Sequence, residues 1–462
     1  MSRTNMPASH PPELNHEGTR VARLRPEQTL RRLCMSTLLW EDGFYVDGKS
    51  HAELIREVLP LVQSHVVAEI AIEARSKQKL RHLPLFLVRE LARKADGTIG
   101  PNRFYSIATV LQSVIQRPDE LAEFLAIYWK DVNRVKEPIS AQVKKGLALA
   151  FQKFDEYALA KYNRDGAIKL RDVMFLVHPK PKDAEQAAVW KRLASGELEV
   201  PITWETQLSA GEKKTEPEKK VIWESLIQEN KLGALAVMRN LRNMQEAGVD
   251  EAMIKGAIRT MKTERVLPFR FIAAARHNPW LEPELEQAML KCLASAEKLP
   301  GKTALVIDTS PSMWGERVSS NSEMDRFEAA AALAILAREV CEAVSIYAFN
   351  QTAHIVPARS GFALRDALAR TKGNASFGGL AVELANSHGY DRIIVLTDGE
   401  WHHGSTQGNA LLVSPPPLTE KAYMVNVANT RNGVGYGKWI SVDGWSEAII
   451  DFIRECESVP LQ

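Results

Sequence analysis

The sequence predicts a multidomain protein in which an all-α half of stacked helices is followed by an α/β domain with a doubly wound sheet. The chain has 462 residues, which is too long for one ordinary hydrophobic core. Apolar residues follow a helical period from about residue 26 to 299, and short β-branched runs alternate with helical stretches after Pro300. Hydrophobic residues make up 45% of the chain and charged residues 25%, which excludes a disordered or fibrous class.

The N-terminal residues and the cysteines favour a cytoplasmic protein. The first thirty residues contain no apolar signal core, and the longest apolar stretch, residues 327–337, is shorter than the roughly 20 residues of a membrane span. We therefore expect no export, no membrane partner and a disordered tail over residues 1–17. The cysteines are too scattered for a zinc site, and we expect reduced, mostly buried thiols at Cys34, Cys292, Cys341 and Cys456.

Helical periodicity dominates from about residue 26 to 299. Amphipathic helices joined by short polar turns predict stacked antiparallel pairs, as in an α-solenoid. Residues 178–220 break the period with many Pro, Lys and Glu, and we expect a long surface excursion there. Two apolar faces illustrate the pattern: Val143, Leu147, Phe151, Phe154 and Ala158 in one helix, and Leu232, Leu235, Met238, Leu241 and Met244 in another.

Residues 300–462 alternate short strands with helices. Such alternation predicts a sheet that is parallel at least in its centre, and ligands bind such sheets at the carboxyl ends of the strands. We expect strands at residues 303–307, 345–349, 393–396 and 423–427, and helices at residues 325–343, 363–370, 380–386 and 447–456.

Two predicted strands end in loops with hard oxygen donors. Asp308, Ser310 and Ser312 occupy alternate positions of one loop, and Asp398 follows another strand. Side chains on alternate residues of a loop project toward a common point, and carboxylate and hydroxyl oxygens suit Mg²⁺ or Mn²⁺. The alternative is that Asp308 and Ser310 merely cap a turn.

This pattern resembles the metal-ion-dependent adhesion site of von Willebrand factor A domains, over about residues 302–456. The resemblance rests on Asp-x-Ser-x-Ser, on a strand that ends in Thr-Asp-Gly, and on the order of strands and helices. In that family a third loop supplies a threonine, and Ser376 is the matching hydroxyl here. The resemblance implies a bound Mg²⁺ or Mn²⁺ that completes its shell with an acidic group of a partner, which is recognition and not catalysis.

The basic residues concentrate in the helical half. Residues 301–462 contain 13 Lys and Arg against 18 Asp and Glu, whereas residues 1–300 contain 46 against 39. This asymmetry makes the helical half the candidate polyanion binder, although an ordinary solvated face explains each cluster taken alone. The cations that we expect to line a phosphate-binding groove are Arg239, Arg242, Lys255, Arg259 and Lys262.

The helical half resembles the TROVE module of the Ro autoantigen and its bacterial relatives across about residues 18–290. The resemblance implies a ring of HEAT-like helical repeats around a basic hole, closed by the A domain. It further implies that Y-type RNA binds the outer surface at Lys161, Arg164 and His178, and that single-stranded 3′ ends of misfolded RNAs enter the hole. Without the resemblance, His178 before a proline indicates only a helix end. The matching stretches are residues 30–34, 161–181, 203–205, 232–244 and 267–271.

The sequence therefore predicts a non-catalytic RNA-binding protein of RNA quality control. We expect a TROVE domain over residues 18–299 and an A domain over residues 300–462. The alternative is a metal-dependent interaction scaffold that captures an acidic partner. A metal-dependent nuclease is a third hypothesis, but His402 and His403 lack an accompanying catalytic motif. An exoribonuclease such as polynucleotide phosphorylase is a possible partner, and a closed ring implies a monomer.

Overall fold

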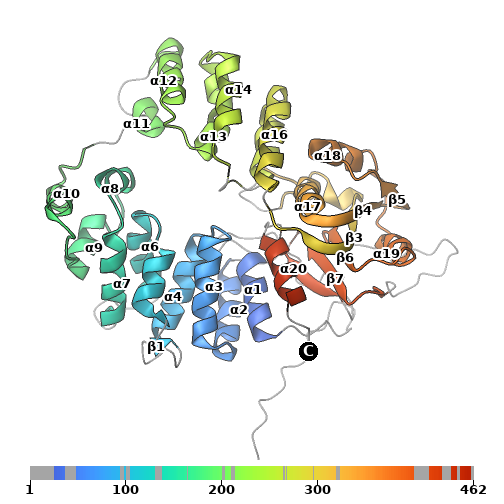
Figure 1. Cartoon of the computed structure of the whole chain (residues 1–462), viewed down its shortest axis with the longest axis horizontal. Helices are drawn as coiled ribbons and strands as arrows, with labels where there is room; N and C mark the ends of the chain where they lie inside the picture. The colour runs from blue at the N-terminus through green and yellow to red at the C-terminus, as the bar shows by residue number, and fades with distance from the viewer. Residues whose placement is uncertain are drawn as a thin grey trace, which may run out of the picture. The chain divides into compact units, whose positions relative to one another are not determined.

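The chain folds into two compact units, each built from segments that are distant in the sequence. Unit 1 comprises Met1–Leu54, Gly233–Gln245 and Asp250–Gln462, and unit 2 comprises Ile55–Leu232 and Glu246–Val249. The elements are labelled in Figure 1. This computed structural model describes residues 25–36, 48–93, 98–99, 105–130, 138–163, 165–199, 203–209, 214–263, 266, 268–294, 296–318, 323–399, 416–428, 439–444 and 448–458.

Unit 2 is a succession of amphipathic helices with buried apolar faces. Several of them begin at a Ser or Asp whose side chain accepts a hydrogen bond from the first turn, as at Ser140, Asp155 and Asp183. Its elements, beyond the end of α2 (Gly48–Val58), are η1 (Leu59–Leu61), α3 (Ser64–Ser76), α4 (His82–Arg93), the hairpin β1 (Thr98–Ile99) and β2 (Tyr105–Ser106), α5 (Ile107–Val114), α6 (Asp119–Tyr128), α7 (Ala141–Phe151), α8 (Glu156–Tyr162), α9 (Leu170–Val177), α10 (Ala184–Ser195), α11 (Trp204–Ser209) and α12 (Glu216–Gln228).

Two features fix the packing inside unit 2. A Cβ at Gly146 of α7 would lie 2.9 Å from the Ala108 Cα of α5, so only glycine allows these two helices to approach so closely. Arg75 of α3 and Glu120 of α6 form a buried ion pair of 2.5 Å. Arg75 also donates from Nε to the Val114 carbonyl at 3.0 Å, which joins α3 to the end of α5.

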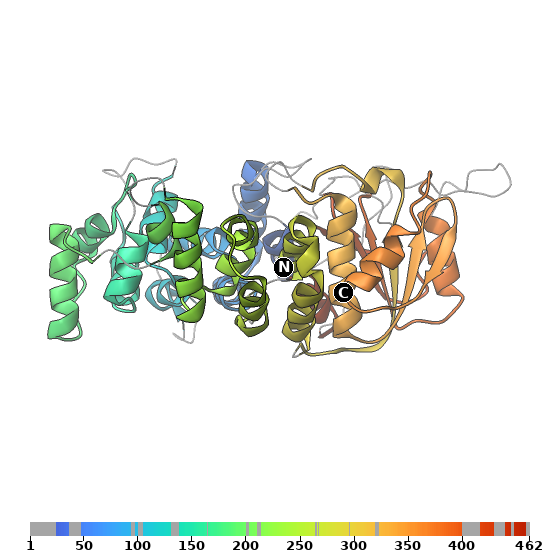
Figure 2. The same ribbon diagram turned by 90° about the horizontal axis from the view of Figure 1, so that it is seen from above.

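Unit 1 combines helices from both ends of the helical half with the α/β domain, which we define as residues 299–458. The helices are α1 (Pro26–Ser36), α13 (Ala234–Glu246), α14 (Glu251–Thr260), α15 (Pro268–His277), η2 (Pro279–Leu281) and α16 (Glu282–Leu293). Helices α15 and α16 pack on α17 (Arg326–Val340) of the α/β domain, and Figure 2 shows them in one row. Helix α1 packs on the C-terminal helix α20 (Ala448–Ser458), where Arg31 and Glu455 lie 3.4 Å apart.

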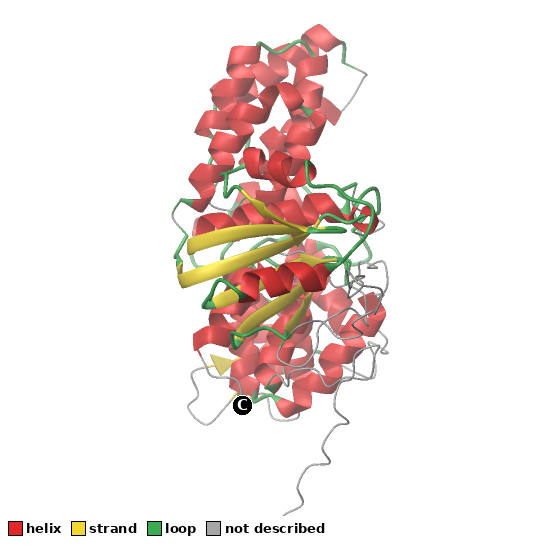
Figure 3. Cartoon of the chain, turned by 90° about the vertical axis from the view of Figure 1, so that its right-hand side faces the viewer, coloured by secondary structure: helices red, strands yellow, loops and turns green. Residues whose placement is uncertain are grey.

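The α/β domain is a six-stranded sheet with the order β5-β4-β3-β6-β7-β8 (Figure 3). All neighbours are parallel except β4 and β5, which form an antiparallel edge. The strands are β3 (Leu299–Asp308), β4 (Cys341–Phe349), β5 (Ala353–Val356), β6 (Arg392–Thr397), β7 (Lys421–Asn426) and β8 (Ile440–Asp443), and the remaining helices are η3 (Pro311–Met313), α18 (Phe362–Ala369) and α19 (Gly378–Asn386).

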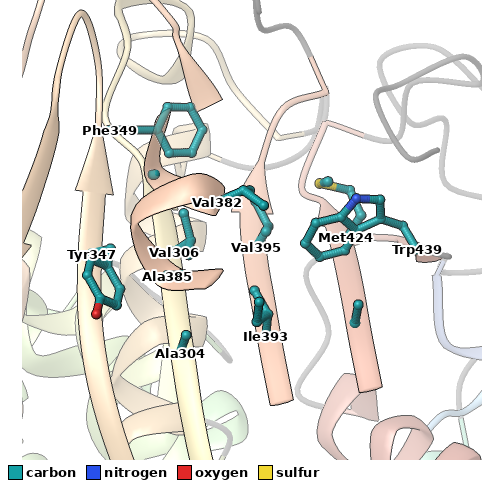
Figure 4. Close-up of a cluster of buried hydrophobic side chains, with 12 residues drawn as sticks. Ala304, Val306, Tyr347, Phe349, Val382, Ala385, Ile393, Val395, Met424 and Trp439 are labelled. Atoms are coloured by element: carbon teal, nitrogen blue, oxygen red, sulfur yellow. The ribbon is translucent and has the colours of Figure 1, made fainter. Parts of the chain in front are cut away.

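One face of this sheet forms a continuous apolar core beneath α19 (Figure 4). Alternate residues of the strands, such as Ala304 and Val306 of β3, pack against Val382 and Ala385 of the helix. The intervening residues of β3 are equally buried because α17 contacts β3, β4 and β6. A sheet that is covered on both faces explains why these strands are uninterrupted apolar runs in the sequence.

The predicted fold class, a helical half followed by a doubly wound α/β domain, is confirmed. Every strand and helix expected after residue 300 is present, and the structure adds β5 and β8. Two expectations in the helical half were wrong. Residues 178–220 are not a surface excursion, since they contain α10, α11 and the start of α12, and the pattern from Val143 to Ala158 belongs to two helices because Asp155 caps a new one.

The cysteines are free thiols, as expected. Cys34, Cys341 and Cys456 are buried and Cys292 is half-buried. None of the helices within the described ranges combines the length and apolar composition that crossing a membrane requires. The N-terminal tail expected over residues 1–17 lies outside the described residues, and the expected boundary between residues 299 and 300 falls at the start of β3.

Candidate functional site

The candidate metal centre lies at the carboxyl edge of the sheet, where the chain changes its direction of winding. From β3 the chain passes through α17 to β4 on one side, and β6 is the neighbour of β3 on the other side. Asp308 is the last residue of β3, and Asp398 follows the last residue of β6. Loops after such adjacent strands leave a crevice between them, which is where doubly wound sheets bind their ligands.

Asp308 is fixed by hydrogen bonds from its own loop and from the end of the neighbouring strand β6. Its Oδ1 accepts from the Ser310 backbone N–H at 2.9 Å, and its Oδ2 accepts from the Thr397 hydroxyl at 2.8 Å. The Ser310 and Ser312 hydroxyl oxygens lie 3.2 Å apart. Asp308 and the two serines expected from the sequence therefore do form one cluster, and Thr397 adds a contact from β6.

Asp308 is a buried carboxylate with another carboxylate close enough to affect it. Burial, and to a smaller extent the charge of Asp398, raises the pKa of Asp308 to about 7, against the lowering effect of the hydrogen bonds from Ser310 and Thr397. Two carboxylates that are withdrawn from water repel each other and favour an additional cation. This electrostatic pattern is typical of a site that binds a positively charged ligand.

A cation of the protein itself already contacts the second carboxylate. Arg326, the first residue of α17, donates from Nη1 to the Asp398 Oδ2 at 3.0 Å and to the Ser312 carbonyl at 3.3 Å. Its side chain is 4% exposed, and that of Asp398 is fully buried. Arg326 thus joins the β3 loop to the loop after β6.

Ser376 belongs to a third loop, whose backbone is hydrogen-bonded to the residues that follow β3 and β4. The Gly373 N–H donates to the Thr309 carbonyl at 3.3 Å, and the Phe377 N–H donates to the Asn350 carbonyl at 2.8 Å. The Ser376 hydroxyl is buried and has no hydrogen-bond partner among the described residues. Because an unpaired buried hydroxyl is unfavourable, it indicates a missing polar partner such as a metal ion or water.

The donor set fits a hard divalent cation. It offers two carboxylates and three hydroxyls, all oxygen donors, as Mg²⁺ and Mn²⁺ prefer. Asp308, Ser310, Ser312 and Ser376 would hold the ion, with Asp398 acting directly or through water. Within the described ranges no cluster of three or more His, Cys, Asp or Glu side chains is suited to a metal.

The cations expected to line a groove lie on and after α13 and α14, with different surroundings. Arg239 and Arg242 are exposed on α13. Lys255 pairs with Glu251 at 2.5 Å, and Arg259 pairs with Glu284 of α16 at 3.0 Å, so both carry a local counter-charge. Lys262 is exposed and lies beyond the last residue of α14, not on the helical face that the sequence predicted.

The residues expected to contact Y-type RNA lie in unit 2. Lys161 is in the last turn of α8, with its Nζ 5.9 Å from the ring centroids of both Tyr157 and Tyr162. His178 is exposed and ends α9 in a left-handed conformation, with φ of 48°. Few residues other than glycine adopt this conformation, so the helix end is sharply defined. Arg164 lies outside the described residues.

Sequence reasoning missed two residues of the candidate metal centre. Thr397 immediately precedes Asp398, and its position at the end of a strand was the available signal. Arg326 gave no such signal, because an arginine at the start of a helix is ordinary until the fold brings it to Asp398. His402 and His403 lie outside the described residues.

Comparisons with known proteins agree with this architecture. Residues 179–327 match the TROVE domain family model. The fold matches the crystal structure of the Ro (RSR) protein of Deinococcus radiodurans with a TM-score of 0.62 and 18% identity, covering 93% of this chain and 98% of that one. No curated protein matches the sequence. The family model thus matches one segment of the helical half and the start of the α/β domain, and the structural match shows that the chain has the fold of a bacterial Ro protein.

Proposed function

We propose that this protein, a relative of the bacterial Ro proteins with a TROVE match, is a non-catalytic RNA-binding protein of the cytoplasm that acts in RNA quality control. It holds a Y-type small RNA through Lys161, Arg164 and His178, and single-stranded 3′ ends of misfolded RNAs through the cations of α13 and α14. The observation that carries the proposal is the TROVE match over residues 179–327 within a Ro-type fold.

The exposed arginines of α13 supply the physical basis for binding 3′ ends. Arg239 and Arg242 lie three residues apart, so both point to the same side of α13. Guanidinium groups bind phosphates without regard to base, which suits a protein that recognises an unpaired tail rather than a sequence. Lys255 and Arg259 would have to exchange their acidic partners for phosphate. The ring and hole implied by the resemblance remain predictions.

The test compares one structured RNA with and without a single-stranded 3′ extension, by fluorescence anisotropy at 50 and 200 mM salt. We expect tighter binding of the extended RNA and a steep loss of affinity with salt, because phosphate contacts release counterions. Equal affinity for both RNAs would remove the 3′-end role. Absence of binding at 50 mM salt would remove RNA binding altogether.

Charge-reversal variants test whether the arginines of α13 form the RNA-binding surface. Arg239→Glu with Arg242→Glu should weaken binding of every tailed RNA and reduce the slope of log affinity against log salt by about 0.7 per lost phosphate contact. Arg359→Glu, at an exposed position of the α/β domain, is the matched control and should bind as the wild type does. Wild-type binding by the α13 variant would exclude these arginines from the site.

A second function is supported by the candidate metal centre. We propose that the centre binds Mg²⁺ or Mn²⁺ and captures an acidic group of a protein partner, possible partners including an exoribonuclease such as polynucleotide phosphorylase. The supporting observations are the two buried carboxylates and, in the loop that is hydrogen-bonded to Thr309, a buried Ser376 hydroxyl with no partner among the described residues. A partner that dissociates both with EDTA and with Asp308→Ala would support this function, and a partner retained in both would overturn it.

A further inference from the structure

The candidate metal centre contains a buried arginine that an oxygen-ligand site does not require. The side chains of Arg326 and Asp398 are 4% and 0% exposed, so this ion pair is almost completely removed from water. The Arg326 Nη1 lies 3.0 Å from the Asp398 Oδ2 and 3.3 Å from the Ser312 carbonyl oxygen. The guanidinium therefore contacts two of the loops whose side chains would surround a metal ion.

The charges at this edge of the sheet are unequal. Asp308 and Asp398 supply two carboxylates, and Arg326 supplies one guanidinium. A divalent ion held by Asp308, Ser310 and Ser312 would share Asp398 with this guanidinium. Because both are cations inside a region of low dielectric constant, each would weaken the attraction of Asp398 for the other.

We propose that Arg326 is an internal counter-cation that competes with the divalent metal for Asp398 and so limits the affinity of the site. The inference rests on the proposed metal centre and names the residue that tunes it. Without metal, the arginine compensates the charge of Asp398 and holds the two loops together. With metal, the same arginine opposes tight binding, so the ion is held weakly and exchanges readily.

The test measures Mn²⁺ affinity by titration calorimetry in the wild type and in Arg326→Gln. We expect the Gln variant to bind Mn²⁺ at least about tenfold more tightly, because the competing charge is gone. Its melting temperature without metal should fall, because the buried Asp398 loses the compensating charge of Arg326, and Mn²⁺ should restore it. Arg359→Gln is the charge-matched control on the surface and should leave both quantities unchanged.

A second pair of variants measures the effect of Arg326 in the absence of the Asp398 carboxylate. In Asp398→Asn the acid is absent, and the double variant Asp398→Asn with Arg326→Gln removes both members of the pair. We expect the double variant to bind Mn²⁺ more tightly than Asp398→Asn alone, because the guanidinium still repels the ion in the single variant. Equal affinities would overturn the charge repulsion between Arg326 and the metal ion on which the inference depends.

The outcomes distinguish a failure of the proposed role of Arg326 from a failure of the proposed metal centre. Mn²⁺ binding that Asp308→Ala abolishes, with no gain in affinity on removing Arg326, would overturn this inference and leave the metal centre intact. Absence of Mn²⁺ binding in the wild type and in every Arg326 variant would overturn the metal centre and the inference together.

Discussion

Each unit of the molecule contains a buried pair of an arginine and a carboxylate, and the two pairs have different surroundings. In unit 2, the Glu120 Oε1 contacts Arg75. Its other carboxylate oxygen, Oε2, accepts hydrogen bonds from the backbone N–H groups of Gln116 and Arg117 at 2.7 and 3.0 Å. In unit 1, Arg326 pairs with Asp398 next to a second buried acid, Asp308.

The difference distinguishes a pair that supports the fold from a pair that belongs to a site. Glu120 is surrounded by cations, since Lys153 and Arg117 lie close enough to interact with it besides Arg75, and the hydrogen bonds of the pair join α3, the end of α5 and α6. In the part of the chain that the structure describes, Asp308 and Asp398 accompany one guanidinium, that of Arg326, and the Ser376 hydroxyl has no hydrogen-bond partner. An excess buried acid and a hydroxyl without a described partner do not stabilise a fold by themselves, so these groups support the proposed metal centre.

The largest expected effect concerns the structural pair. Glu120→Ala leaves Arg75 buried without its partner, and the free energy of unfolding should fall by about 3–5 kcal/mol. Urea denaturation measures the loss, and Mn²⁺ should not restore it because unit 2 contributes no ligand to the candidate centre. The double variant Glu120→Ala with Arg75→Met should recover much of the stability. A loss below 1 kcal/mol would mean that this pair is no more important than one on the surface.

The next effect concerns the excess acid. Mn²⁺ at about 100 times its dissociation constant should stabilise the wild type by about 2.7 kcal/mol. Asp308→Asn should abolish this response and make the metal-free protein more stable than the wild type, because it removes the repulsion between Asp308 and Asp398. Melting curves at pH 8, where Asp308 is ionised, measure both quantities. If the metal-free Asp308→Asn variant is less stable than the wild type, Asp308 stabilises the fold and is not an excess acid.

A smaller effect is expected at the unpaired hydroxyl. Ser376→Ala should weaken Mn²⁺ binding about tenfold, equivalent to about 1.4 kcal/mol, because one oxygen donor is lost. The stability of the metal-free protein should stay within about 0.5 kcal/mol of the wild type, since no hydrogen bond is broken. Calorimetric titration and melting curves test the two parts, and Ser387→Ala on the surface after α19 is the control. Unchanged Mn²⁺ affinity would exclude Ser376 as a ligand.

The smallest effect concerns an exposed pair in unit 1. Arg276 of α15 lies 2.9 Å from Glu328 of α17, with the arginine side chain 45% exposed. Surface ion pairs contribute about 0–1 kcal/mol, so Arg276→Ala should reduce the free energy of unfolding by no more than that, and less at high salt. Urea denaturation at 50 and 500 mM salt provides the measurement. A decrease in the free energy of unfolding as large as that of Glu120→Ala would show that exposed and buried ion pairs contribute equally to the stability of this protein.

The sequence predicted the candidate site best where a functional residue directly follows an element that is itself easy to recognise. Strands β3 and β6 are continuous apolar runs that end in Asp308 and Thr397, so their ends and the donors after them could be predicted together. Strand β5 has only four residues at an edge, and β8 follows a glycine-rich stretch, so neither shows a clear period. The helices after His178 were missed because surface charge hides a short apolar face.

The two ion pairs could not be predicted, for a different reason. Arg326 and Asp398 are 72 residues apart, and Arg75 and Glu120 are 45 apart. Nothing in the local sequence of an arginine indicates which distant carboxylate it will meet, because that depends on how β6 is placed beside β3 and on how α6 is placed relative to α3. Ser376 could be predicted only through its resemblance to a known loop, and its lack of a partner is visible only in the structure.

The first turn of α17 is shared by two neighbours, and this has a thermodynamic consequence. Arg326 contacts Asp398 at the sheet edge, whereas Glu328 accepts from Arg276 of α15 in the helical half. A ligand that shifts this turn at Arg326 therefore changes the free energy of the contact between Glu328 and Arg276, and the reverse also holds. Linkage requires the effect to be equal in both directions: whatever factor a metal ion imposes on binding at α15, a ligand held there imposes on the metal ion.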